Sequence, residues 1–128
     1  MSREQTERRP TLLMVDDEAR ILTALRRTLR REGYELLTAG TAAEAIRVLE
    51  ERPVDLILSD QKMPGMSGLA LLAEVARRQP TVARLLITGW TEAVPPEELK
   101  KLDVKALVPK PWEDAELKQV LRDVLAAR

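Results

Sequence analysis

The most constraining feature of this sequence is a series of five short apolar runs that alternate with segments of helical periodicity. The runs occupy residues 11–16, 34–39, 54–59, 84–88 and 105–109. Short runs of this kind are typical of strands that are buried on both faces of a sheet. Because parallel neighbours need long crossover connections, the alternation predicts a parallel sheet with helices on both sides.

Between the runs, apolar residues recur every three or four positions, which is the pattern of a helix that packs by one face. The pattern predicts a first helix around Ile21 to Leu29, and Gly33 is expected to stop it. Thr41 and Glu44 form a capping box for the second helix. The remaining helices are expected from Leu69 onward and at 96–102 and 113–127. Five βα units predict a doubly wound, three-layer α/β sandwich, but periodicity does not fix the strand order.

A length of 128 residues suits one domain with a single core. Residues 1–10 are polar and lack the apolar segment of a secretory signal, so we expect a flexible tail followed by a domain at 11–128. The chain has one Tyr, two Trp and no Phe, and its core must therefore be aliphatic.

The chain contains no His and no Cys. This excludes disulfides, thiol nucleophiles, Cys/His zinc sites and Ser-His-Asp triads. A bound metal would have oxygen ligands, which suits Mg²⁺, Ca²⁺ or Mn²⁺. Basic and acidic residues number 21 each, and a net charge of zero argues against direct binding of nucleic acid or of an anionic membrane. The lack of Cys is compatible with the cytoplasmic location that we expect.

Polar side chains follow four of the five apolar runs. Asp16 and Asp17 end the first run, Asp60 follows the third, Thr88 ends the fourth and Lys110 follows the fifth. Each of them alone is explained by a cap, a turn or an exposed surface position. Ligands of open α/β sheets, however, bind outside the carboxyl ends of the strands, so we expect these residues to gather there.

This set of groups suits phosphoryl transfer. Three crowded carboxylates repel one another, and a hard cation such as Mg²⁺ relieves the repulsion. An aspartate can act as a nucleophile and form an aspartyl phosphate. Thr88 and Lys110 are of the right types to bind phosphoryl oxygens.

Four stretches closely resemble the receiver domain of bacterial two-component response regulators. They are VDDE at 15–18, LILSDQKMPGMSG at 56–68, LLITGW at 85–90 and VPKPW at 108–112. Their order and spacing fit along residues 11–127. The resemblance implies a flavodoxin-like (βα)5 fold with strand order 2-1-3-4-5.

The resemblance also implies roles for single residues. Asp60 would accept a phosphoryl group from a phosphohistidine on a sensor histidine kinase or a histidine phosphotransfer protein. Thr88 and Lys110 would bind that group, and the Lys110–Pro111 peptide bond would be cis. The ligands of Mg²⁺, which Mn²⁺ can replace, would be the side chains of Asp17 and Asp60 and the backbone carbonyl of Lys62, with Asp16 contributing through water. A receiver is a switch and not a turnover enzyme, and at most it catalyses its own phosphorylation and dephosphorylation.

The sequence departs from the family pattern in three places. Leu107 occupies a position where the family often has an aromatic residue that changes rotamer, and our hypothesis is that Trp90 supplies the moving ring. Lys62 and Trp90 stand at the positions that tune the lifetime of the phosphoryl group in the family, and they favour slow self-dephosphorylation. The proline-led helix at 96–102 is short, which would alter the usual output face.

The sequence is compatible with several partners and with alternative functions. The basic residues of the first helix (Arg20, Arg26, Arg27, Arg30, Arg31) form either a solvated face or, with Ala19 and Leu22, a kinase-docking surface. The output partner is unknown, and a homodimer is left open. One alternative is a Mg²⁺-dependent phosphohydrolase with an aspartate nucleophile, although such enzymes typically carry D-x-D at the first strand. Another is a degenerate receiver that acts only by binding proteins.

Overall fold

The computed structural model describes residues 9–89 and 93–128. In these ranges five strands alternate with five helices. Their order is β1 (Thr11–Val15), α2 (Ala19–Leu29), β2 (Glu35–Ala39), α3 (Ala42–Glu51), β3 (Leu56–Asp60), α4 (Gly68–Arg78), β4 (Ala83–Gly89), α5 (Pro96–Lys101), β5 (Val104–Lys110) and α6 (Asp114–Ala127).

The strands form one parallel sheet in the order β2-β1-β3-β4-β5, as the resemblance implied. This register sets the carboxyl ends of neighbouring strands side by side. Asp60 is paired with Ile87, and Gly89 is paired with Lys110. Pro109, which has no backbone N–H to donate, lies in an edge strand, where such a residue is tolerated.

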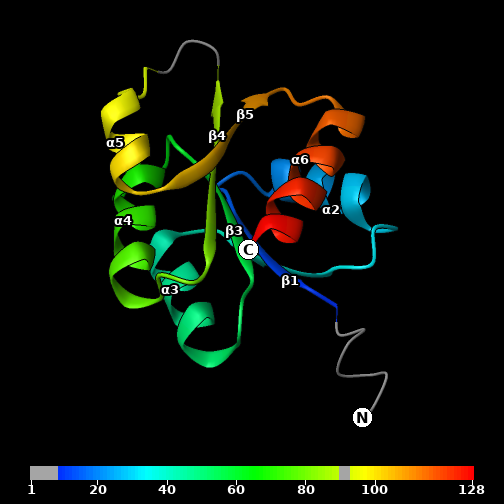
Figure 1. The fold of residues 1–128 in the computed structure, drawn as a ribbon, viewed down its shortest axis with the longest axis horizontal. Coiled ribbons are helices and arrows are strands. Elements are labelled where there is room, and N and C mark those ends of the chain that lie inside the picture. Colours follow the sequence, from blue (N-terminus) through cyan, green and yellow to red (C-terminus); the bar gives the residue numbers. More distant parts are fainter. Residues whose placement is uncertain (1–8, 90–92) are drawn as a thin grey trace.

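The sheet is the middle of three layers. Helices α3, α4 and α5 cover one face, and α2 and α6 cover the other (Figure 1). The two sides of β1 show how the layers are held together. Leu13 and Val15 belong to the core under α3 and α4, whereas Leu12 and Met14 belong to the core under α2 and α6. The fully buried large side chains are aliphatic, as composition predicted.

Some element bounds differ from the predicted ones by a few residues. The third strand spans Leu56–Asp60 and not the predicted 54–59. Val54 is buried, as an apolar strand residue would be, but it lies outside the paired strand. The first helix ends at Leu29, and Gly33, with a φ of 88°, lies in the turn that follows. Residues 1–8 of the expected tail lie outside the described residues, but the Pro10 carbonyl already accepts a hydrogen bond from Glu35 N at 2.9 Å.

The capping box of α3 differs from the standard one in the backbone N–H that its glutamate binds, which belongs to Gly40 and not to the N-cap residue Thr41. The Thr41 hydroxyl accepts a hydrogen bond from Glu44 N at 3.0 Å, as predicted, while the Glu44 carboxylate reaches back to Gly40 N at 2.6 Å. Among the described helices, none combines the length and the apolar character needed to cross a bilayer.

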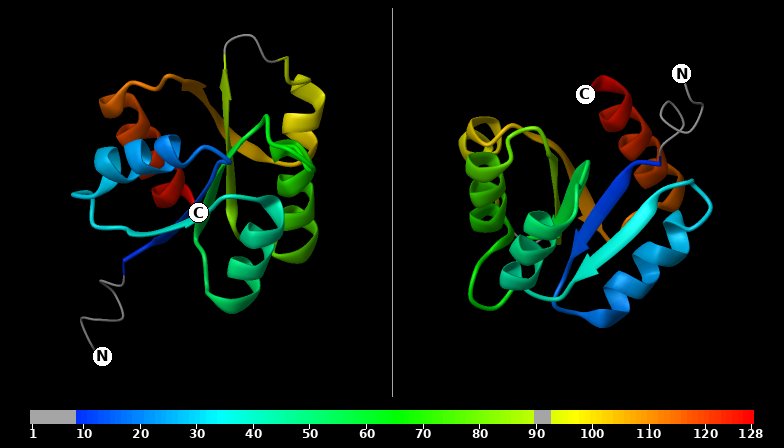
Figure 2. Two further views of the ribbon diagram at one scale, coloured as in Figure 1. Left: turned by 180° about the vertical axis from the view of Figure 1, so that it is seen from behind. Right: turned by 90° about the horizontal axis from the view of Figure 1, so that it is seen from below.

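Asp55, the residue just before β3, contacts both Thr11 at the start of β1 and Arg128 after α6. Its Oδ2 accepts a hydrogen bond from Thr11 N at 2.7 Å, and its Oδ1 lies 2.8 Å from Nη1 of Arg128. Both views of Figure 2 show the course of the first strand and the last helix from other sides. Asp55 therefore ties the amino end of β1 and the last residue of the chain to the same edge of the sheet.

Candidate functional site

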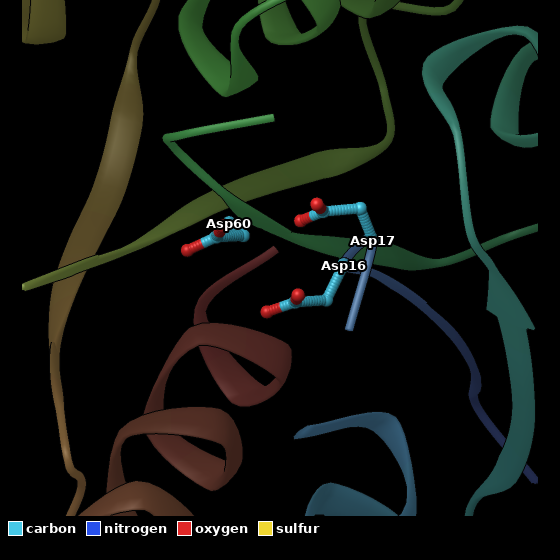
Figure 3. Close-up of side chains that lie close together, drawn as sticks. All are labelled: Asp16, Asp17 and Asp60. Atoms are coloured by element: carbon cyan, nitrogen blue, oxygen red, sulfur yellow. The ribbon is translucent and has the colours of Figure 1, made fainter. Parts of the chain in front are cut away.

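The candidate site lies at the carboxyl ends of the strands, opposite Asp55. Asp16 and Asp17 come directly after β1, and Asp60 and Lys110 are the last residues of β3 and β5. The three aspartates project side by side from adjacent strand ends (Figure 3). Three carboxylate oxygens, one from each aspartate, lie within 4.8 Å of one another. The sheet thus brings the three predicted carboxylates together and places the predicted ammonium beside them.

The site is only partly open to solvent. Asp16 and Asp60 are buried, with exposed fractions of 1% and 2%, whereas Asp17 is exposed. Lys110 is half-buried, and its Nζ lies 2.9 Å from Oδ1 of Asp60 and 3.6 Å from Oδ2 of Asp16. One ammonium therefore bridges the two buried carboxylates and compensates part of their charge.

The electrostatics follow from this crowding. Burial raises the pKa of the Asp16 carboxyl, and the nearby charge of Asp60 raises it further, against the opposing effect of the hydrogen bond from Glu18 N at 2.8 Å. Burial by itself lowers the pKa of Lys110. The hydrogen bond to Asp60 and the charges of Asp16 and Asp60 outweigh that effect, so the pKa of Lys110 is raised and the ammonium form is favoured.

The donor set fits a hard divalent cation. Within the described part of the chain, the buried Oδ2 of Asp16 accepts no hydrogen bond. A buried carboxylate oxygen of this kind, beside two further carboxylates, matches the oxygen ligands that Mg²⁺ takes in proteins. Lys62 lies two residues after Asp60 in the loop between β3 and α4, and its side chain is exposed.

Thr88 and Leu107 occupy the strand positions that the sequence predicted. Thr88 is half-buried near the end of β4, paired with Pro109 and one residue beyond the partner of Asp60. Leu107 is 45% exposed. The Lys110–Pro111 peptide bond is cis, as the resemblance implied. Trp90, to which we assigned the moving ring, lies outside the described residues, and that hypothesis stays a prediction.

Gly68 is a supporting residue that the sequence did not reveal. A Cβ atom at this position would lie 2.2 Å from the carbonyl oxygen of Asp60 and 2.8 Å from Cδ1 of Leu86. The Gly68 N–H also donates to the Gln61 carbonyl at 2.9 Å, which closes the loop after β3. Only a glycine allows this approach of α4 to the end of β3. In the sequence it was visible only as part of a glycine- and proline-rich turn.

Comparison with known proteins identifies the family. The sequence model described as the response regulator receiver domain matches residues 12–122. The chain belongs to this family. Receiver domains act as phosphoacceptor switches in two-component systems, and nothing in the comparisons favours the phosphohydrolase or the degenerate receiver.

Curated relatives of this receiver include transcriptional regulatory proteins. The hydrogenase transcriptional regulatory protein HoxA of Cupriavidus necator is 36% identical over 127 residues, which cover 96% of this chain and 26% of that protein. The transcriptional regulatory protein GlrR of Escherichia coli is 34% identical over 114 residues, covering 89% of this chain and 26% of that protein. The receiver thus spans about a quarter of the length of these relatives.

Solved structures show the same fold. The signal receiver domain of an HD domain-containing protein from Pseudomonas fluorescens Pf-5 superposes with a TM-score of 0.89 at 34% identity, covering 94% of this receiver and 97% of that chain. The chemotaxis protein CheY4 of Vibrio cholerae superposes with a TM-score of 0.82 at 28% identity, covering 91% and 98%.

Proposed function

We propose that residues 11–128 form one receiver domain that takes up a phosphoryl group on Asp60. The observation that carries this proposal is the surroundings of Asp60. Asp60 is the last residue of a central strand, and its buried carboxylate lies 2.9 Å from the Lys110 ammonium. One of its oxygens lies within 4.8 Å of an oxygen of each of the other two aspartates. Phosphoryl transfer needs little more than a positioned acceptor and compensation of charge, and this cluster offers both.

The donor in this proposal is a phosphohistidine of a sensor histidine kinase or a histidine phosphotransfer protein. A carboxylate oxygen of Asp60 forms the new P–O bond while the P–N bond of the donor imidazole breaks and its electron pair stays on that nitrogen. Lys110 holds one phosphoryl oxygen as a point charge, and Thr88 donates a hydrogen bond to another. Because these two residues lie on β5 and β4, phosphorylation at the end of β3 acts on the adjacent strand β4 and on the edge strand β5 beyond it.

Asp16, Asp17, Asp60 and the backbone carbonyl of Lys62 are the proposed ligands of Mg²⁺, which Mn²⁺ can replace. When bound, the cation supplies positive charge to the acceptor carboxylate and to the phosphoryl oxygens. The pKa of Asp16 is raised by burial and by the charge of Asp60, and a bound cation would offset both effects by stabilising the ionised carboxylate. The proposed donors act inside the cell, so the proposal places the protein in the cytoplasm.

The test is stoichiometric labelling of Asp60. The protein is incubated with Mg²⁺ and a small phosphodonor, and intact mass and peptide mapping follow the product. We expect one phosphoryl group on Asp60, labile to base and to hydroxylamine as an acyl phosphate is, with no labelling in Asp60→Asn or when Mg²⁺ is chelated.

Two outcomes would contradict the proposal. Repeated turnover of phosphate esters would point to the phosphohydrolase, and an unlabelled wild type in the presence of Mg²⁺ would point to a degenerate receiver. The Asp123→Asn variant is the matched control, because Asp123 lies on α6 away from the cluster and should be labelled like the wild type.

A further inference from the structure

Three polar side chains close a hydrogen-bonded triangle beside the candidate site. The indole Nε1–H of Trp112 is shared between Thr28 Oγ1 at 3.2 Å and Asp114 Oδ1 at 3.1 Å. The Thr28 hydroxyl in turn donates to Asp114 Oδ1 at 3.0 Å. We call this set the Thr28–Trp112–Asp114 triangle. It joins α2, the connection from β5 to α6, and the first residue of α6, and neither the family roles nor the proposed function uses it.

The triangle holds the segment that follows Lys110. The sheet fixes the chain up to Lys110, which is paired with Gly89, and α6 fixes it again from Asp114. Only residues 111–113 connect the two. Of these, Trp112 is partly buried and packs against the core under α2 and α6. The position of this ring therefore sets the path along which the chain leaves Lys110.

The apolar contacts of Trp112 leave part of the space between α2 and this connection unfilled. A groove lies between the helix and the connection, lined by Ala24 and Thr28 on one wall and by Lys110, Pro111 and Trp112 on the other. Across such a groove, a directional hydrogen-bond network is the means of fixing one geometry. Each polar atom of the triangle is used in a compatible way, since the indole only donates, the carboxylate only accepts, and the hydroxyl does both.

We infer that the Thr28–Trp112–Asp114 triangle is a positioning device for Lys110, which sets where Nζ lies between Asp60 and Asp16. The inference rests on the proposed function, because it concerns the contribution of Lys110 to phosphoryl transfer. A displacement of about 1 Å in a positioned group can reduce a rate by as much as roughly a hundredfold. Loss of the triangle should therefore be visible as slower phosphorylation, while the proposed metal ligands at the ends of β1 and β3 keep their places.

The first experiment replaces Thr28 in the full chain. Thr28→Val keeps the shape of the side chain but removes two of the three hydrogen bonds, and Thr28→Ser restores the hydroxyl. With a small phosphodonor and saturating Mg²⁺, we expect Thr28→Val to lower the rate of Asp60 phosphorylation roughly tenfold, with rescue by Thr28→Ser. Mg²⁺ affinity, measured by calorimetry, should be unchanged. In a Trp90→Phe background, the emission of Trp112 should shift in Thr28→Val and return in Thr28→Ser.

A double-mutant cycle separates positioning from general loosening. In a Lys110→Met background there is no ammonium to position, so Thr28→Val should cause no further loss of rate. Thr23→Val on the exposed side of the same helix is the matched control and should behave as the wild type. An equal loss in both backgrounds, or no loss in the wild-type background, overturns the inference. A wild type that takes up no phosphoryl group at Asp60 overturns the proposed function itself, which makes the two failures distinguishable.

Discussion

Asp16 is the residue at which the demands of folding and of the site conflict. Its carboxylate is buried, lies beside a second buried carboxylate, and has one oxygen that accepts no hydrogen bond in the described part of the chain. Burial raises its pKa, so the ionised form is less favourable in the folded protein than in the unfolded chain. The folded state therefore holds a charge cluster that a cation would relieve.

Replacing Asp16 by Asn should stabilise the metal-free protein. At about pH 7.5, without Mg²⁺, we expect the free energy of unfolding to rise by about 1–2 kcal/mol, because a buried like charge is removed while Lys110 keeps its contact with Asp60. Urea unfolding in a chelator measures this change. The exposed Asp17→Asn is the matched control, for which we expect a smaller gain.

The pH dependence of that gain has a definite sign. An acid whose pKa is raised by folding opposes folding when it is ionised in both states, and this penalty disappears once the pH falls below its pKa in both states. The advantage of Asp16→Asn should therefore shrink as the pH falls towards about 4. It should also shrink when Mg²⁺ is added, because binding stabilises the wild type. An advantage that grows on acidification would contradict this account.

The site residues differ in how readily the sequence reveals them. Asp16, Asp60 and Lys110 were predictable because each follows an apolar run, and parallel strands bring such positions to one edge. Gly68 was not, because its importance comes from a carbonyl oxygen eight positions earlier that only the folded chain brings against it. Trp112 was visible as an aromatic residue, but its partner Thr28 lies 84 positions away and no local pattern predicts that contact.

At the scale of elements, the approach of α4 to the end of β3 holds the acceptor in place. Gly68→Ala should lower the free energy of unfolding by about 1–3 kcal/mol, because the added methyl group overlaps the Asp60 carbonyl and the Leu86 side chain. It should also slow phosphorylation of Asp60, since the backbone of β3 has to move. Chemical denaturation and the labelling rate measure the two effects.

Gly40→Ala serves as the control for this substitution. A Cβ at Gly40 would meet only the Glu44 carboxylate, at an ordinary 3.7 Å, and its position is likewise at the carboxyl end of a strand. We expect a markedly smaller change in both measurements. Equal destabilisation by the two substitutions would show that the contact with Asp60 has no special weight.

Helix α2 carries the surface that we predicted for kinase docking. Ala19 and Arg26 are exposed, but Leu22 is half-buried and packs against the core, so a charge at Leu22 would loosen the fold as well as the surface. Arg26→Glu is the cleaner change. It should slow phosphotransfer from the cognate kinase by roughly threefold to tenfold, chiefly through association, and leave labelling by a small phosphodonor unchanged.

The matched control reverses the same charge on the opposite side of the sheet. Arg47 on α3 is exposed, and α3 covers the face away from α2 (Figure 1). Arg47→Glu should leave transfer from the kinase as it is in the wild type. If both variants slow kinase transfer equally, net charge and not the α2 surface is responsible.

At the scale of the whole molecule, the alternation of apolar runs with helical periodicity was sufficient to predict the layered sandwich. The strand order came from the resemblance to receiver domains. The finer bounds depended on tertiary contacts. Val54 reads as part of a strand because it is apolar, yet it is buried by packing outside the ladder. The end of the first helix was predicted a few residues too late, at Gly33, whereas α2 ends at Leu29.

The meeting of Thr11 and Arg128 at Asp55 has a consequence for engineering. Both contacts lie at the start of β3, and the acceptor lies at its other end, so a linker from residue 128 to residue 11 would not pass over the site. A circular permutant opened in the turn around Gly33 would keep every strand neighbour of Asp60. The new termini of such a permutant would lie between α2 and β2. The linker between residues 128 and 11 would form a loop at the end of β3 opposite Asp60.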